Sequence, residues 1–266
     1  VAKGNWATKL VTVFPSNQAL NKPVIDGLVV LGDQRTGEIL ALMDGKTITA
    51  MRTGAVTGTS IRRLARQDAA SVGLVGCGVQ GYYQLRYACA ARPIRQIALY
   101  DLSADAMAAM QERLQQALPE VQVQLAASTA ELARASEILI AATTARQPVF
   151  PDDPSLFAGK HCVAIGSFEP DVREYPDAVF SLLEKVWVDI DFATEESGEL
   201  IVPLEQGLLQ DEQVETLGHF IRSGRAPERG RYGTTFSKSV GMALLDLTTA
   251  RLAYAKALEK GLGTEL

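Results

Sequence analysis

The sequence is poor in the residues that build disulfide frameworks and metal sites. Its 266 residues include only three cysteines and two histidines. Cys77, Cys89 and Cys162 are unevenly spaced in apolar stretches, so neither disulfides nor a zinc cluster is predicted, and a reducing cytosol is the expected compartment. With only His161 and His219, a histidine-based metal site is not predicted either. His161 is expected to be a strand residue with a satisfied hydrogen bond.

Excess positive charge and long apolar runs are also lacking. The chain has 26 Lys and Arg against 31 Asp and Glu, a net charge of −5, which argues against a nucleic-acid partner. No apolar run approaches the roughly 20 residues of a membrane span, and no signal-peptide pattern is visible, so no membrane partner is expected. The composition, 47% hydrophobic and 21% charged, is that of a globular protein with one large or two modest domains.

A glycine-rich turn is the most informative motif that is present. An apolar strand, 71–75, leads into Gly76, Gly78 and Gly81, and an amphipathic helix and a second strand ending at Asp101 follow. Gly76 permits the tight turn, Gly78 lets backbone N–H groups approach a pyrophosphate, and Gly81 lets the helix lie near the sheet. A carboxylate at position 101 would bind the adenosine ribose hydroxyls and repel a 2′-phosphate, which favours NAD(H) and leaves NADP(H) as the second option.

Strands alternate with helices from this motif onward. This alternation predicts an α/β fold, a Rossmann doubly wound parallel sheet that binds ligands at the carboxyl ends of its strands. The predicted strands are 71–75, 96–100, 121–126, 137–141, 161–165 and 185–189, and the predicted helices are 79–91, 104–118 and 129–135.

The first part of the chain has the pattern of an antiparallel sheet. An alternating strand covers 9–14, and short apolar strands at 28–31 and 39–43 predict a hairpin. A long C-terminal helix, 238–260, has an apolar stripe that is expected to pack on this sheet, which makes the first domain discontinuous. The predicted domains are a substrate and dimerisation domain, 1–66 with 238–266, and an NAD(P)-binding domain, 67–237.

A further helix is predicted from Ile48 to about Ala65, with Thr47 as its cap. Gly54 and Gly58 lie four residues apart on one face of it, which permits close approach of another backbone or of a ligand.

Two cations in the first domain are candidates for holding an anionic substrate beside a nicotinamide. Lys9 lies in the alternating strand and Arg52 near the start of the helix. A guanidinium can bind a carboxylate at two points, and an ammonium adds a point charge. Taken singly, each is also typical of a solvated surface charge.

Ordered motifs run along nearly the whole chain. They are Lys9 with Phe14-Pro15-x-Asn17, Thr36-Gly37, Arg52-Thr53, Gly76-x-Gly78-x-Gln80, Ala142-Thr143-Thr144, Phe236 to Gly241 and Asp246-Leu247. Together they resemble the ornithine cyclodeaminase/mu-crystallin family. The resemblance implies a homodimeric NAD(P)-dependent enzyme in which Lys9 and Arg52 hold the substrate carboxylate, with Gly241 also at the substrate. The cofactor residues it implies are Thr53, Gly76, Gly78, Val79, Gln80, Gly81, Asp101, Thr143, Thr144 and Val240. The family also has a further N-terminal stretch, with another substrate-binding arginine, that is not in this sequence.

One departure from the family separates its activities. Ornithine cyclodeaminases have an aspartate where this chain has Phe168, which can neither accept a proton nor pair with an ammonium group. The segment containing Asp171, Arg173 and Glu174 looks more like the ketimine-reductase branch. A structural ion-pair cluster is an equally weighted interpretation of these three residues.

The leading hypothesis is therefore an NAD(P)H-dependent reductase of cyclic α-imino acids such as Δ1-pyrroline-2-carboxylate. A protonated cyclic imine needs mainly positioning, because hydride can reach its carbon once the carboxylate is held. The alternatives are an amino-acid or N-alkyl amino-acid dehydrogenase, an ornithine cyclodeaminase, and a mu-crystallin-like protein that binds a small ligand without turnover.

Overall fold

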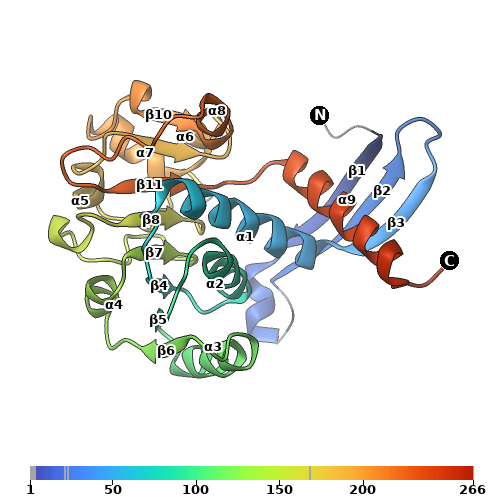
Figure 1. The fold of residues 1–266 in the computed structure, drawn as a ribbon, viewed down its shortest axis with the longest axis horizontal. Coiled ribbons are helices and arrows are strands. Elements are labelled where there is room, and N and C mark those ends of the chain that lie inside the picture. Colours follow the sequence, from blue (N-terminus) through green and yellow to red (C-terminus); the bar gives the residue numbers. More distant parts are fainter. Residues whose placement is uncertain (1–3, 21, 23, 168, 266) are drawn as a thin grey trace. The chain divides into compact units, whose positions relative to one another are not determined.

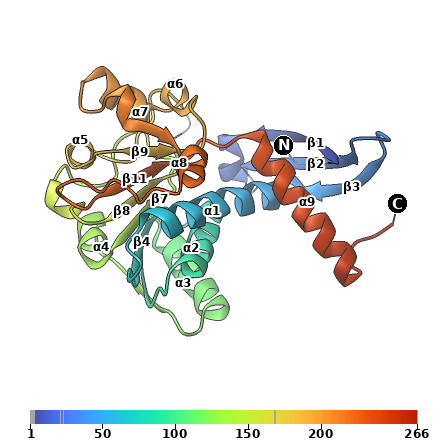
Figure 2. The same cartoon turned by 45° about the horizontal axis from the view of Figure 1, so that its top comes forward.

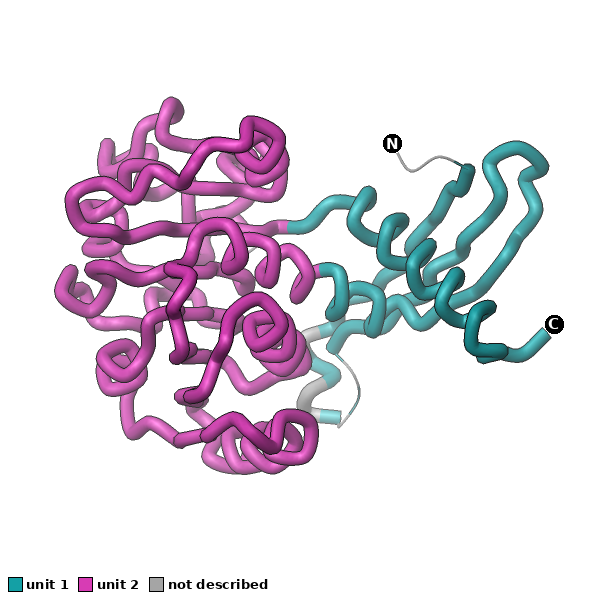
Figure 3. The backbone as a smooth tube through the Cα atoms, in the orientation of Figure 1, with its two compact units in different colours: residues 1–52, 241–266 teal, residues 53–240 magenta. Residues whose placement is uncertain are grey.

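A computed structural model of the chain describes residues 4–20, 22, 24–167 and 169–265. The chain folds as two compact units, unit 1 (1–52 with 241–266) and unit 2 (53–240), shown in Figure 3. Helix α1 (Gly45–Leu64) contributes residues to both units. Its second half, 53–64, thus lies in the unit that holds the parallel sheet, whereas the sequence pattern groups it with the first domain.

Unit 1 is a three-stranded antiparallel sheet with a helix on one face. Strands β1 (Asn5–Val13), β2 (Ile25–Asp33) and β3 (Ile39–Asp44) are hydrogen-bonded in that order, which confirms the predicted hairpin. Helix α9 (Ala243–Lys260) lies against this sheet and runs obliquely across its strands in Figures 1 and 2. A small core of Val29, Leu31, Ile48 and Ala250 joins them, so the C-terminal helix packs on the N-terminal sheet as predicted. A 3-10 helix, η1 (Pro15–Leu20), connects β1 and β2.

Unit 2 is built on an eight-stranded sheet in which every pair of neighbouring strands is parallel. The strand order is β10-β9-β11-β8-β7-β4-β5-β6, so the direction of winding reverses at β4 and β7. The predicted doubly wound fold is thereby confirmed. The strands are β4 (Ser71–Val75), β5 (Gln96–Tyr100), β6 (Gln122–Leu125), β7 (Ile138–Ala141), β8 (His161–Ala164), β9 (Val186–Val188), β10 (Val214–Thr216) and β11 (Thr235–Lys238).

Helices cover both faces of this sheet, because the buried strands are apolar on both sides. The second half of α1 packs with α2 (Val79–Ala91) and α3 (Ala104–Ala117) on one face. The other face packs against α4 (Thr129–Ala135), α5 (Asp177–Phe180) and α7 (Gly198–Glu205). The shorter elements are α6 (Ala193–Glu196), α8 (Leu217–Ser223), η2 (Pro154–Leu156) and η3 (Asp211–Gln213). In the part of the chain that the structure describes, none of the helices has the length and apolarity of a membrane span.

The close approach predicted for the two helical glycines is confirmed within unit 2. A Cβ on Gly54 would lie 2.6 Å from Tyr87 Cδ2 and 3.0 Å from the Tyr83 carbonyl oxygen, and one on Gly58 would lie 3.1 Å from Tyr87 Cβ. Helices α1 and α2 therefore pack at a distance that a larger side chain would not allow.

Two helix starts differ from the prediction. Helix α1 begins at Gly45, and its cap is the Asp44 carboxylate, which accepts a hydrogen bond from Thr47 N at 2.7 Å. Helix α9 begins at Ala243, because Lys238 ends β11, a strand that the sequence pattern missed. Two hydroxyl residues and a lysine in four positions hide a strand that is buried throughout.

Candidate active site

Lys9, Arg52 and Asp246 form a largely buried charge cluster within unit 1. Lys9 Nζ lies 3.0 Å from Asp246 Oδ1 and donates a hydrogen bond to Thr49 Oγ1 at 3.4 Å. Arg52 Nε lies 3.8 Å from the same carboxylate oxygen. The side chains of Lys9, Arg52 and Asp246 are 20%, 12% and 7% exposed. Two cations beside one anion carry a net positive charge, which suits the cluster to bind a carboxylate.

Local structure explains how these side chains meet. The register of the antiparallel sheet pairs Lys9 with Val29, so both face α9, where Asp246 lies in the first turn. Gly241 has φ +95°, a left-handed conformation, and a Cβ there would lie 2.8 Å from Arg52 Nη2. Glycine at this position thus permits both the backbone turn and the approach of the guanidinium.

The glycine-rich turn in unit 2 has the geometry of a pyrophosphate site. Gly76 has φ +100°, as its predicted tight turn requires, and a Cβ on Gly81 would lie 2.8 Å from Leu74 Cδ2, which confirms the close packing of α2 on the sheet. Gly78 is the N-cap of α2, and within the described residues no side chain caps this helix. A Cβ on Gly78 would meet nothing within 4 Å. Open space at an uncapped helix N-terminus fits a phosphate group.

Asp101 lies at the end of β5, beside this turn. Its Oδ2 accepts a hydrogen bond from Cys77 N at 2.7 Å and its Oδ1 accepts one from Ser103 N at 2.9 Å. Each oxygen of a carboxylate can accept two hydrogen bonds, so the side chain retains capacity for the two ribose hydroxyls. The carboxylate is therefore held in place by the turn that would carry the pyrophosphate.

The other predicted cofactor residues are distributed over unit 2. Thr143 donates hydrogen bonds from both its N and its Oγ1 to Glu174 Oε1, at 2.7 and 2.9 Å. Val240 N donates to Asp189 Oδ1 at 3.2 Å. Thr53 is buried in α1, Val79 and Gln80 open α2, and Thr144 follows Thr143 in the loop after β7.

The three residues interpreted either as functional or as an ion-pair cluster have different environments. Asp171 pairs with Arg146, and Arg173 donates to Asp177 at 2.8 Å, so both lie in ion pairs of unit 2. Glu174 is fully buried and accepts hydrogen bonds from backbone N–H groups. Phe168, on which the departure from cyclodeaminases depends, lies outside the described residues.

Asp246, and Glu174 as a hydrogen-bond acceptor, have roles in the structure that the sequence pattern does not predict. For Asp246 the available signal was an acid after three apolar residues in the first turn of the helix, a position that also suits an exposed acid at a helix N-terminus. Burial of that acid depends on Lys9, which is 237 residues away in the chain. No local pattern reports such a contact.

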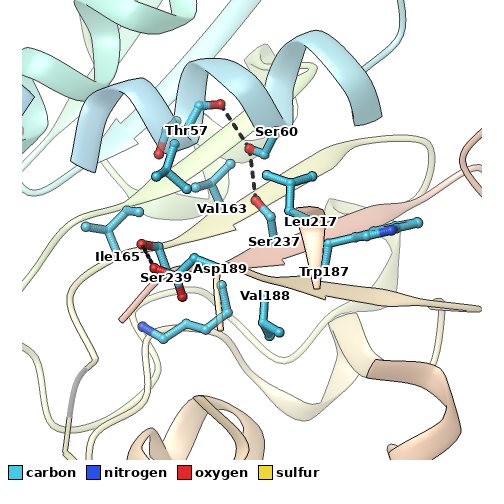
Figure 4. Close-up of a pocket in the computed structure, with 12 residues that line it drawn as sticks. Thr57, Ser60, Val163, Ile165, Trp187, Val188, Asp189, Leu217, Ser237 and Ser239 are labelled. Carbon is cyan, nitrogen blue, oxygen red and sulfur yellow. Dashed lines mark hydrogen bonds between the residues drawn. The ribbon is translucent and has the colours of Figure 1, made fainter. Parts of the chain in front are cut away.

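The small pocket of Figure 4 lies between α1 and the parallel sheet. Its volume is about 10 Å³, room for a single water-sized sphere, so it cannot hold an amino acid. Ser60 Oγ accepts a hydrogen bond from Ser237 Oγ at 3.1 Å on its wall, and Ser239 donates to Asp189 at 2.6 Å.

His161 is satisfied by hydrogen bonds, as predicted, since its ring contacts Thr235 Oγ1 at 2.9 Å and Ser60 Oγ at 3.3 Å. Burial lowers its pKa to about 3. Burial, helped by the charge of Asp101, raises the pKa of Cys77 to about 12, so this thiol is not a reactive thiolate. Among the residues described, no three His, Cys, Asp or Glu side chains are grouped to hold a metal ion.

Comparison with known proteins gives consistent matches along the chain. A family model described as the ornithine cyclodeaminase/mu-crystallin family matches residues 1–261. A Bacillus cereus protein named Delta(1)-pyrroline-2-carboxylate reductase is 34% identical over 260 residues, which are 97% of this chain and 79% of that protein.

Solved structures agree with these matches. The Thermococcus litoralis Delta(1)-pyrroline-2-carboxylate reductase in complex with NADH and L-proline is 34% identical, with a TM-score of 0.90 over 98% of this chain and 80% of that one. An archaeal alanine dehydrogenase dimer with bound NAD is 26% identical, with a TM-score of 0.87 over 99% and 81% of the two chains.

Proposed function

This chain belongs to the ornithine cyclodeaminase/mu-crystallin family, and we propose that within it the chain is an NAD(H)-dependent reductase of cyclic α-imino acids. The resemblance read from the ordered motifs is thereby confirmed. The expected substrates are ketimines of the Δ1-pyrroline-2-carboxylate type. Reduction adds hydride to the carbon of the C=N bond and gives the saturated cyclic amino acid.

The observation that carries the proposal is the pair of cations, Lys9 and Arg52, gathered around Asp246. A cyclic imino acid has one carboxylate, and the cluster has one net positive charge to receive it. The similarity of the chain to pyrroline-2-carboxylate reductases, 34% identity over 97% of its length, supports the same substrate class.

The chain's own residues have two tasks in this reaction. Lys9 and Arg52 hold the carboxylate, which fixes the imine carbon in space, and Asp246 keeps the Lys9 ammonium in place. NAD(H), when bound, supplies the hydride. Because the ring nitrogen of a protonated imine already carries its proton, the carbon accepts hydride without a proton donor from the protein, and positioning provides most of the rate enhancement.

The residues at the glycine turn fit the cofactor. Gly78 leaves open space at the uncapped start of α2 for the pyrophosphate, and Asp101 would accept hydrogen bonds from the ribose. A negative charge at that point opposes a 2′-phosphate, which supports NAD(H) over NADP(H). The three unpaired cysteines suit a reducing compartment such as the cytosol.

We also propose that the chain forms a homodimer through unit 1. Helix α9 covers one face of the antiparallel sheet, whereas Leu10, Leu28 and Leu42 are 63%, 38% and 48% exposed. The register places all three on the opposite face, where they form an apolar surface suited to a second copy. The dimer described for the archaeal alanine dehydrogenase supports this assembly.

An amino-acid dehydrogenase is the second candidate, because an alanine dehydrogenase shares the fold at 26% identity. Oxidation of NADH with purified protein and either Δ1-pyrroline-2-carboxylate or pyruvate with ammonium, followed at the nicotinamide absorbance, separates the two. Faster turnover of the cyclic imine is expected. Turnover of pyruvate with ammonium, but not of the cyclic imine, would assign the chain as an amino-acid dehydrogenase. Tight cofactor binding without turnover of either substrate would favour a binding protein.

A further inference from the structure

Three charged side chains, those of Glu174, Glu199 and Lys238, are buried together in unit 2. The residues are 0%, 0% and 1% exposed. Burying isolated charges is unfavourable, so such a group persists only when hydrogen bonds or opposite charges compensate it. Neither substrate binding by Lys9 and Arg52 nor the glycine turn involves these three residues.

Glu174 joins the loops that leave two neighbouring strands. Its Oε1 accepts hydrogen bonds from Thr143 N and Thr143 Oγ1, at 2.7 and 2.9 Å, just after β7. Its Oε2 accepts from Gly166 N at 2.6 Å and Ile165 N at 3.0 Å, just after β8. A Cβ on Gly166 would lie 2.6 Å from Glu174 Oε1, so glycine is needed for this approach. One carboxylate thus fixes the spacing of two loops.

Glu174 is itself held by its neighbours. Its backbone N donates to Glu199 Oε2 at 2.7 Å, and Tyr175 N donates to Glu199 Oε1 at 3.1 Å. Lys238 interacts electrostatically with both glutamates and supplies the opposite charge. Burial raises the pKa of Glu199 to about 7, although the Lys238 ammonium acts to lower it. The second carboxylate and the ammonium therefore support the first.

The position of this cluster in the sheet connects it with the reaction. In a doubly wound sheet a dinucleotide lies across the carboxyl ends of the strands where the winding reverses, here at β4 and β7. The glycine turn after β4 takes the pyrophosphate, so the loops after β7 and β8 border the nicotinamide half. These are the loops that Glu174 joins.

We propose that Glu174 is a positioning residue for hydride transfer, which fixes the loops after β7 and β8 where the nicotinamide ring binds. This inference rests on the proposed function. Thr143 is its partner, because the threonine hydroxyl donates to Glu174 and accepts from Ala145 N at 3.2 Å. The carboxylate accepts its hydrogen bonds from Thr143, Ile165 and Gly166 and not from the glycine turn, so we expect its loss to change how the ring is held rather than whether the cofactor binds.

The first test is Glu174→Gln in the full chain, which replaces one acceptor oxygen by an NH₂ group facing backbone donors. We expect kcat with Δ1-pyrroline-2-carboxylate to fall about 10- to 100-fold, the loss that small misplacements of reacting groups produce. The dissociation constant of NADH, from fluorescence titration, should stay within about threefold because the pyrophosphate site is unaltered. The matched control is Glu205→Gln, the same change at an exposed position of α7, which should behave as wild type.

Two further readouts separate positioning from general stability. The kinetic isotope effect with NADH deuterated at the transferred position should rise in Glu174→Gln, because misplacement slows the hydride step itself. Thr143→Val should reproduce the defect and Thr143→Ser, which keeps the hydroxyl, should restore activity. A fall in activity that only matches the fraction of NADH-binding sites lost, with no change in isotope effect, would overturn the inference, as would an unchanged kcat.

Failure of the proposed function is recognised separately. If wild type reduces no cyclic imine, the proposed activity is wrong, and the fluorescence lifetime of bound NADH then tests the inference alone. A lifetime in Glu174→Gln that differs from that in wild type and Glu205→Gln supports a role at the nicotinamide ring. An identical lifetime contradicts it.

Discussion

Replacement of Arg52 by alanine tests the substrate site most directly. The guanidinium is 12% exposed, and the substrate carboxylate would lose its charge-assisted hydrogen bonds to it. Hydrogen bonds to charged groups contribute about 1.5–3 kcal/mol, which corresponds to an increase of about 10- to 150-fold in KM for the cyclic imine. Asp246 keeps its partner Lys9 at 3.0 Å, so no buried carboxylate is left unpaired and the fold should survive.

The assay measures two quantities for each variant, the KM for the imine from NADH oxidation and the dissociation constant of NADH from fluorescence. Arg52→Lys should recover part of the loss, because an ammonium keeps the charge but not the two-point geometry. Arg63→Ala, on an exposed part of the same helix, should match wild type. If the affinity for NADH falls as much as the capture of imine, or if the KM is unchanged, Arg52 does not hold the substrate carboxylate.

Four other changes have defined outcomes. Asp246→Asn removes the anion between two buried cations and should destabilise the free protein by about 3 kcal/mol, with partial recovery on adding L-proline, measured by thermal unfolding; an unchanged melting temperature would contradict the pairing. Asp101→Ser should relax the discrimination against NADPH, so the ratio of kcat/KM with NADH to kcat/KM with NADPH should fall. The same ratio in the variant and in wild type would refute a ribose role for Asp101. His161 is neutral in the fold and has a pKa of about 3, against 6.5 when unfolded, so its contribution to stability is full above pH 6.5 and is lost as the pH falls toward 3, by at most about 1.4 kcal/mol per pH unit. His161→Gln should flatten that part of the pH–stability curve, and an unaltered slope would show that His161 does not cause it. Leu10→Lys should shift the protein toward monomer in light scattering, and an unchanged mass would exclude this face of the sheet as the dimer contact.

In the C-terminal half of unit 2, the sequence pattern predicts the apolar strands but not the polar strand β11. Apolar runs such as Ile138–Ala141 and His161–Ala164 identify buried parallel strands, because both faces of a central strand need apolar side chains. Strand β11 lies between β8 and β9 and is equally buried, yet it reads as polar. Its lysine is buried among acidic side chains from distant segments, since Glu174, Glu199, Asp189 and Glu196 all interact electrostatically with it.

The sequence by itself determined the doubly wound sheet, the glycine turn and the packing of the last helix on the first sheet. These follow from local periodicity and from the backbone freedom of single glycines, both of which are visible in a short window. Tertiary structure decided which charges are paired. Lys9 contacts Asp246, 237 positions away in the chain, and Glu174 joins two loops. A buried charge needs a partner to offset its desolvation, and such a partner can lie anywhere in the sequence, so no local pattern predicts it.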